Sequence, residues 1–187
     1  MGEGGRSPGE GWRVLVIGYG NPGRLDDGLG PAFASELEQA GLPGVTVEAD
    51  YQLAVEDARA LADHDVVVFV DASLTAPEPF SFRRIEAKPE AHFSSHIVEP
   101  EGVLALAREL FGATTEAYVL GIRGYVFDEF GETISEQGRA NLAAALAFLE
   151  RVIRAGSFGE AAREQKEQSV PDSTPSDEDG PCTTGST

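Results

Sequence analysis

The feature that most constrains the fold of this chain is residues 66–70, a run of valines and one phenylalanine without a polar position. A strand that is apolar on both faces is typical of the centre of a parallel sheet with helices on both sides. Similar strand patterns lie at 14–17, 45–49 and 118–122, and helix patterns alternate with them. The sequence therefore predicts a three-layer α/β fold with a doubly wound, mostly parallel sheet and helices on both faces.

Residues 80–86 alternate between apolar and polar positions, which predicts a fifth strand with one solvated face. The link that joins this strand to Asp71 is too short to hold a helical crossover, so we expect it to run antiparallel at an edge of the sheet. Helices are expected at 31–40, 55–62, 100–111 and 137–153.

The domain organisation follows from composition. Residues 13–155 carry the alternating strand and helix patterns and are expected to form a single α/β domain. Residues 1–12 are Gly-rich and polar, so we expect a flexible leader. Residues 156–187 are rich in Gly, Ser, Thr, Pro and acidic residues, and we expect them to form a disordered acidic tail.

The net charge of −18 and the sequence pI of about 4.4 restrict the partners. Nucleic acid and anionic membrane surfaces would repel such a chain, so we expect neither as a partner. The one cysteine, Cys182, cannot form an internal disulfide, and no apolar stretch is long enough to cross a membrane. These features predict a cytoplasmic protein, and we expect a monomer.

The first strand pattern ends in a glycine-rich loop at 18–30 that contains a Gly-x-Gly-x-x-Gly match to dinucleotide-binding proteins. Asp50 could then serve as the ribose-binding acid, so an oxidoreductase of this type is one alternative. Pro22 and the paired acids Asp26 and Asp27 argue against it, because two carboxylates would repel a pyrophosphate.

Three residues form a candidate metal site. Asp27 lies in the glycine-rich loop, Asp71 ends the most buried strand pattern, and His96 lies in a serine-containing loop before a helix. The carboxyl ends of parallel strands meet at one edge of such a sheet, where ligands bind. Two carboxylates and one imidazole suit a divalent metal and leave coordination positions open. His64 is expected at the surface.

Simpler roles for the same residues remain open. An acid just before a helix can cap it, which would account for one of Asp26 and Asp27. Asp71 could cap the turn that follows it. The glycines around the paired acids expose the backbone, as the close approach of a ligand or substrate chain would require.

Taken together, residues 16–21, 26–30, 70–72 and 95–96 resemble the motifs of the NiFe-hydrogenase maturation endopeptidases, peptidase family M52. The resemblance extends over about residues 13–153. It implies an α/β fold with a twisted five-stranded sheet. It also implies one reaction, the removal of a C-terminal peptide from the hydrogenase large-subunit precursor after nickel has been inserted.

The resemblance implies that Asp27, Asp71 and His96 bind the metal, and it makes Asp26, Asp27 and Asp71 the candidate catalytic residues. The nickel would be carried by the precursor, which is the expected partner, and no organic cofactor is expected. Cleavage could use nickel as a Lewis acid or a carboxylate such as Asp26 or Asp71 as a general base.

Residues 121–125 and 132–135 are similar to the branch of this family that serves bidirectional, NAD-linked hydrogenases. Besides the dinucleotide-binding oxidoreductase, a second alternative function is a non-enzymatic, metal-handling chaperone that shields the immature subunit.

Overall fold

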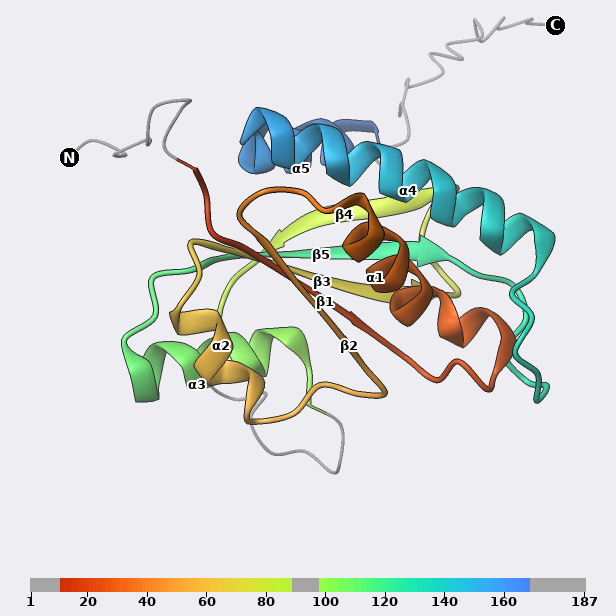
Figure 1. Cartoon of the computed structure of the whole chain (residues 1–187), viewed down its shortest axis with the longest axis horizontal. Helices are drawn as coiled ribbons and strands as arrows, with labels where there is room; N and C mark the ends of the chain where they lie inside the picture. The colour runs from red at the N-terminus through yellow and green to blue at the C-terminus, as the bar shows by residue number, and fades with distance from the viewer. Residues whose placement is uncertain (1–10, 89–97, 169–187) are drawn as a thin grey trace, which may run out of the picture.

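The computed structural model describes residues 11–88 and 98–168. Its centre is a sheet of five strands, β1 (Val14–Tyr19), β2 (Val45–Asp50), β3 (Val66–Ser73), β4 (Phe80–Ile85) and β5 (Glu116–Arg123). The strands lie in the order β2-β1-β3-β5-β4, and β4 pairs antiparallel with β5 while the other pairs are parallel (Figure 1). This confirms the predicted mostly parallel sheet with an antiparallel edge strand.

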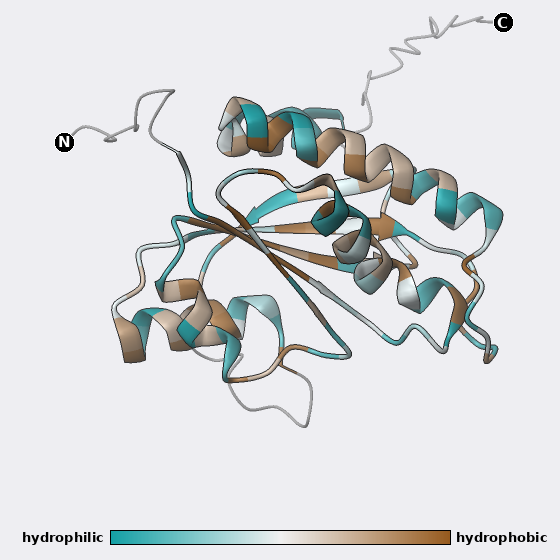
Figure 2. Ribbon diagram, viewed as in Figure 1, coloured by the Kyte–Doolittle hydropathy of each residue, from teal (hydrophilic) through white to brown (hydrophobic). Residues whose placement is uncertain are grey.

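Helices cover both faces of the sheet. Helices α1 (Leu29–Ala40), α4 (Glu136–Ala155) and α5 (Phe158–Gln168) pack on one face, and α2 (Asp57–Ala62) and α3 (Pro100–Phe111) pack on the other (Figure 1). The side chains of β3 alternate between the two apolar cores that result, and its first five residues are fully buried. Apolar residues accordingly line the strands between the layers (Figure 2).

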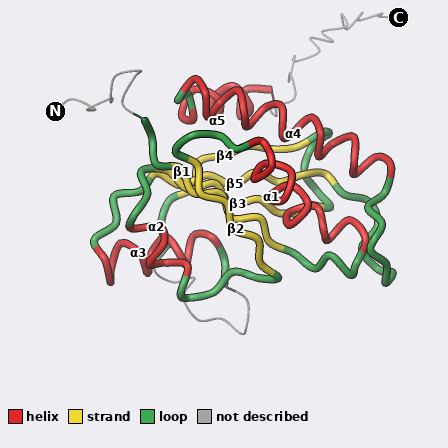
Figure 3. Tube along the Cα trace, in the orientation of Figure 1, coloured by secondary structure: helices red, strands yellow, loops and turns green. Residues whose placement is uncertain are grey.

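The predicted boundary of the disordered tail at residue 156 is wrong. Residues 158–168 form helix α5, which packs against β4 (Figure 3). Phe158 is only 2% exposed, and its ring lies 6.3 Å from that of Trp12 and 5.7 Å from that of Tyr118. Trp12, which we assigned to the flexible leader, is therefore packed against the domain. Residues 1–10 and 169–187 lie outside the described residues.

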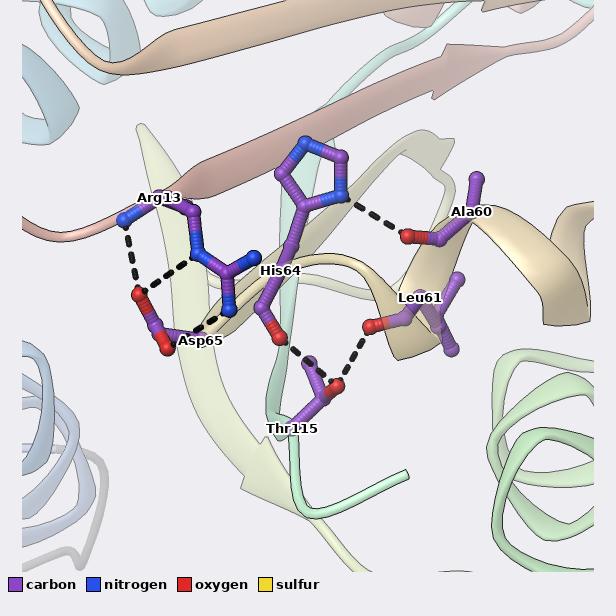
Figure 4. Close-up of polar contacts among 6 residues, drawn as sticks. All are labelled: Arg13, Ala60, Leu61, His64, Asp65 and Thr115. Carbon is purple, nitrogen blue, oxygen red and sulfur yellow. Dashed lines mark hydrogen bonds and ion pairs between the residues drawn. The ribbon is translucent and has the colours of Figure 1, made fainter. Parts of the chain in front are cut away.

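A polar network lies at the amino ends of the parallel strands, where these strands begin (Figure 4). The guanidinium of Arg13 lies 3.2 Å from the Asp65 carboxylate, and the Thr115 hydroxyl contacts the carbonyl oxygens of Leu61 and His64. The Nδ1 atom of His64 lies 2.8 Å from the carbonyl oxygen of Ala60. His64 thus has a structural role far from the carboxyl ends of the strands.

None of the helices that the described residues form combines the length and the apolar character needed to cross a membrane.

Candidate functional site

The site is built at the carboxyl ends of β1 and β3. These neighbouring strands are the point at which the strand order reverses, because β1 connects through α1 to β2 on one side while β3 lies on its other side. Connections that leave in opposite directions open a crevice between two strand ends, which is where such folds bind ligands. The loop that contains Asp26 and Asp27 follows β1, and Asp71 lies near the carboxyl end of β3.

The glycines of the loop make room for the chain itself, which corrects our expectation that they make room for a substrate. A Cβ atom at Gly18 would overlap the carbonyl oxygen of Gly30, and one at Gly30 would overlap that of Tyr19. Gly20 has a φ of +138°, and its Cα faces the carbonyl oxygen of Asp27. Helix α1 can therefore begin directly against the strand ends.

Asp26 is fully buried and its carboxylate is saturated with hydrogen bonds. It accepts bonds from the backbone N–H of Ser135 (2.7 Å), Tyr125 (2.8 Å) and Val126 (3.2 Å), and from the Ser135 hydroxyl (2.8 Å). Burial alone would raise the pKa of Asp26, but these bonds outweigh it and lower the pKa below its ordinary value. Asp26 therefore ties the loop to residues 124–135.

Ser135 extends this connection into helix α4. Its hydroxyl, which donates to Asp26, also accepts a hydrogen bond of 3.0 Å from the backbone N–H of Gly138 and so caps the helix. The geometry makes Asp26 a positioning residue and leaves its carboxylate no free face for a substrate.

Asp27 is half-buried, and its carboxylate accepts a hydrogen bond of 3.2 Å from the backbone N–H of Asn21. The N-cap residue of α1 is Gly28, which provides no side-chain cap. Since Asp26 bonds to residues 125–135 and Asp27 bonds to Asn21, neither acid caps α1. The capping alternative is therefore wrong for both residues.

Asp71 is half-buried beside Tyr19, whose hydroxyl forms a hydrogen bond with it. Burial raises the pKa of Asp71 to about 6, and the charge of Asp27 contributes to this rise. The N–H of Ala72, at 2.8 Å, and the Tyr19 hydroxyl oppose it by stabilising the carboxylate. The following turn is capped by the Ser73 hydroxyl instead, so Asp71 is not needed for that purpose.

A polar cavity of about 640 Å³ opens beside Asp71. Tyr19 lines it from β1, Arg83 from β4 and Glu101 from the first turn of α3. Both terminal nitrogens of Arg83 lie 3.2 Å from one oxygen of the nearly buried Glu101 carboxylate, so this pair fixes α3 against the edge strand. Sequence reasoning missed Tyr19 and the Arg83–Glu101 pair.

His96, the third expected metal ligand, lies within residues 89–97, outside the described residues. Lys88 and Glu99, on either side of that segment, both line the cavity that contains Asp71. The structure thus places Asp27 and Asp71 at one crevice, near enough for the charge of one to act on the other, and does not test His96.

Asp50, the acid expected to bind ribose in the oxidoreductase alternative, belongs to a cluster of three acids at the end of β2. Its carboxylate lies with those of Glu48 and Asp57, with ligand atoms within 4.8 Å of one another. This concentration of negative charge, together with the filled space at Gly18 and Gly20, does not favour a phosphate-bearing cofactor.

Neither a protein-family model nor a curated protein sequence matches this chain. Solved structures do match, and they share its α/β fold. One is a hydrogenase 2 maturation peptidase from a Thaumarchaeota archaeon, with a TM-score of 0.58 and 26% identity, covering 75% of this chain and 97% of that one.

Two further structures agree. The hydrogenase maturation protease HycI from Thermococcus kodakarensis KOD1 has a TM-score of 0.60 and 21% identity, over 78% of this chain and 95% of that one. The hydrogenase maturating endopeptidase HybD from E. coli has a TM-score of 0.57 and 22% identity, over 78% and 94%. The predicted resemblance to the hydrogenase maturation endopeptidases, a class of hydrolases, is confirmed.

Proposed function

We propose that this protein is an endopeptidase that removes the C-terminal extension of a NiFe-hydrogenase large-subunit precursor after nickel insertion. The observation that carries the proposal is the contrast among three acids at one crevice. Asp26 is fully buried and its carboxylate is occupied by hydrogen bonds within the protein. Asp27 and Asp71 are half-buried and accept fewer hydrogen bonds. Like charges held close together at a strand-order reversal are typical of a functional site.

Recognition would use the nickel that the precursor already carries. Asp27, Asp71 and His96 would contact it with two carboxylates and one imidazole, which are suitable ligands for a borderline divalent metal. A precursor without nickel would offer nothing to these side chains and would face two uncompensated carboxylates. Discrimination would therefore come from a lost attraction and from repulsion together.

Two chemical routes to cleavage are consistent with this arrangement. The carboxylate of Asp71 could accept a proton from the water that attacks the scissile carbonyl carbon, and a raised pKa of about 6 suits a general base near neutral pH. Alternatively, the substrate's nickel could polarise that carbonyl as a Lewis acid. In both routes Asp26 has an indirect role: its hydrogen bonds to residues 125–135 fix the loop that carries Asp27.

The test is in vitro processing of nickel-loaded precursor by Asp27→Asn and His96→Ala, followed by mass spectrometry. Both variants should fold and fail to release the extension. Asp63→Asn is the control, because this exposed acid follows α2 and precedes β3 at the amino ends of the strands, away from the crevice, and it should process normally. Full processing by both site variants would overturn the assignment, and binding without any cleavage by the wild type would point to a chaperone.

The finer predictions concern the substrate and the setting of the reaction. Three properties stay predictions: that the substrate belongs to a bidirectional, NAD-linked hydrogenase, that the protein is cytoplasmic, and that it is a monomer. Processing assays with precursors from different hydrogenase classes would test the first of them.

A further inference from the structure

Large apolar side chains are exposed around the crevice. Tyr51, which follows β2, is 70% exposed, Leu74, which follows β3, is 58% exposed, and Phe130, in the loop after β5, is 89% exposed. We call these three residues the apolar rim. Each lies in a loop at the carboxyl edge of the sheet, the same edge that carries Asp27 and Asp71.

Backbone hydrogen bonds join the loops that carry the apolar rim to the loop that carries Asp27. Such bonds connect the rim loops to the loop after β1 or to one another, among them Gly20 N–H to Asp50 C=O (3.1 Å), Leu25 N–H to Gly131 C=O (2.8 Å) and Gly124 N–H to Ser73 C=O (3.0 Å). The guanidinium of Arg24 also lies 5.8 Å from the centre of the Phe130 ring. The rim residues are therefore held on the loops that border the carboxylates.

The surface between these side chains is acidic. The four loops at 20–28, 50–57, 71–79 and 124–135 contain one base, Arg24. Apart from the buried Asp26, their acids are Asp27, Asp50, Glu56, Asp57, Asp71, Glu78, Asp128, Glu129 and Glu132. Asp128 and Glu129 directly precede Phe130 and are exposed. A partner that covers this surface must offer apolar contacts together with positive charge.

We propose that the apolar rim is the docking surface for the folded body of the protein substrate, which presents an apolar patch bordered by Lys and Arg side chains. This inference rests on the proposed function. Exposed apolar side chains that gather at one place mark interaction surfaces, and aromatic anchors often dominate the energy of an interface. The rim would hold the substrate while its C-terminal segment reaches Asp71.

Two other occupants are disfavoured by charge. A second copy of this chain would place one acidic surface against another, which opposes association. The C-terminal segment of this chain is also acidic, with Asp172, Asp177, Glu178 and Asp179 and no base after Lys166. Charge complementarity therefore selects a partner with a basic surface.

The test compares two double variants that remove similar side chains from opposite edges. Leu74→Ser with Phe130→Ser alters the rim, and Leu110→Ser with Phe111→Ser alters the end of α3 at the amino edge of the sheet, where the residues are 59% and 44% exposed. The rim variant should bind nickel-loaded precursor at least about tenfold more weakly and show a matching rise in KM, with kcat within about twofold of wild type. The control should stay within about twofold in both.

The outcomes separate this inference from the proposed function. Equal affinity and KM for the two double variants, with an active wild type, would overturn the docking surface and leave the proposed function standing. A wild type that neither binds nor cleaves the precursor would overturn both. A wild-type dimer that becomes monomeric in the rim variant, measured by light scattering, would make a second copy the occupant and overturn the proposal.

Discussion

At the scale of single residues, the adjacent acids Asp26 and Asp27 have different roles because of one turn of 3-10 helix. Leu25, which has a positive φ of 50°, is the first residue of this turn, Leu25–Gly28. Successive residues of a 3-10 helix point about 120° apart, so one acid can enter the protein while the next faces the crevice. Asp26 accordingly reaches Ser135, and Asp27 stays half-exposed beside Asn21.

Asp26→Asn should destabilise the protein strongly. An amide has one acceptor oxygen and would present an N–H₂ group to backbone donors, so we expect a loss of about 3 kcal/mol in the free energy of unfolding. Urea unfolding measures this loss. Asp27→Asn is the control and should change the free energy by less than about 1 kcal/mol, so similar losses in the two variants would contradict the division of roles.

Asp71→Asn should stabilise the free protein at neutral pH. The folded-state pKa of about 6 lies above the ordinary value of 3.8, so the charged form is disfavoured by folding. The stability that Asp71 contributes is present below pH 3.8 and is lost as the pH rises through about 6. The partly exposed site reduces the expected gain to about 1–2 kcal/mol at pH 7.

Thermal unfolding of wild type and Asp71→Asn at pH 4 and pH 7 checks this prediction. The stabilisation should be present at pH 7 and nearly absent at pH 4. A difference that does not change with pH would show that burial does not raise the pKa of this carboxyl.

At the scale of elements, the sequence predicted the strands well because burial leaves a clear pattern. β3 is apolar on both faces, and the short link after it leaves β4 no course except an antiparallel one. Helix α5 was missed because Phe158, Ala161 and Ala162 are the apolar residues that it buries, among Glu, Gln, Arg and Lys. So few apolar residues give no visible period, and α5 packs against β4 and the Trp12 ring, which are both distant in the sequence.

Phe158→Ala should therefore lower the free energy of unfolding by about 3–5 kcal/mol, as expected for the removal of a buried aromatic ring. Phe130→Ala, at an 89% exposed position, should leave it within about 0.5 kcal/mol. Denaturant unfolding distinguishes the two. A small effect at Phe158 would mean that α5 adds little to the stability of the domain.

Gly30→Ala should destabilise the junction between β1 and α1. Alanine normally favours a helix over glycine by about 1 kcal/mol, but here the added Cβ would overlap the carbonyl oxygen of Tyr19. Gly159→Ala in α5 is the matched control, since its nearest contact would be the Tyr118 hydroxyl at 3.8 Å. Calorimetry should show a lower Tm for Gly30→Ala and an unchanged or higher Tm for Gly159→Ala, and a stabilised Gly30→Ala would contradict the packing.

At the scale of the whole molecule, the placement of Asp27 and Asp71 could be predicted because parallel strands end at a common edge. The contribution of Tyr19 could not, since its hydroxyl meets Asp71 only through the side-by-side pairing of β1 and β3. The Arg83–Glu101 pair depends in the same way on α3 packing beside the edge strand. The positions of the two carboxylates could therefore be predicted from the order of the strands in the sequence. Their neighbours Tyr19, Arg83 and Glu101 could be identified only from the tertiary structure.

The central claim is that the crevice cleaves a protein whose nickel is already in place. The most direct measurement is the intact mass of the large-subunit precursor after incubation with this protein, with and without prior nickel loading. The account predicts that the loaded precursor loses its C-terminal extension while the nickel-free precursor keeps it. Equal cleavage of both precursors, or an extension that stays attached to the loaded one, would contradict the account.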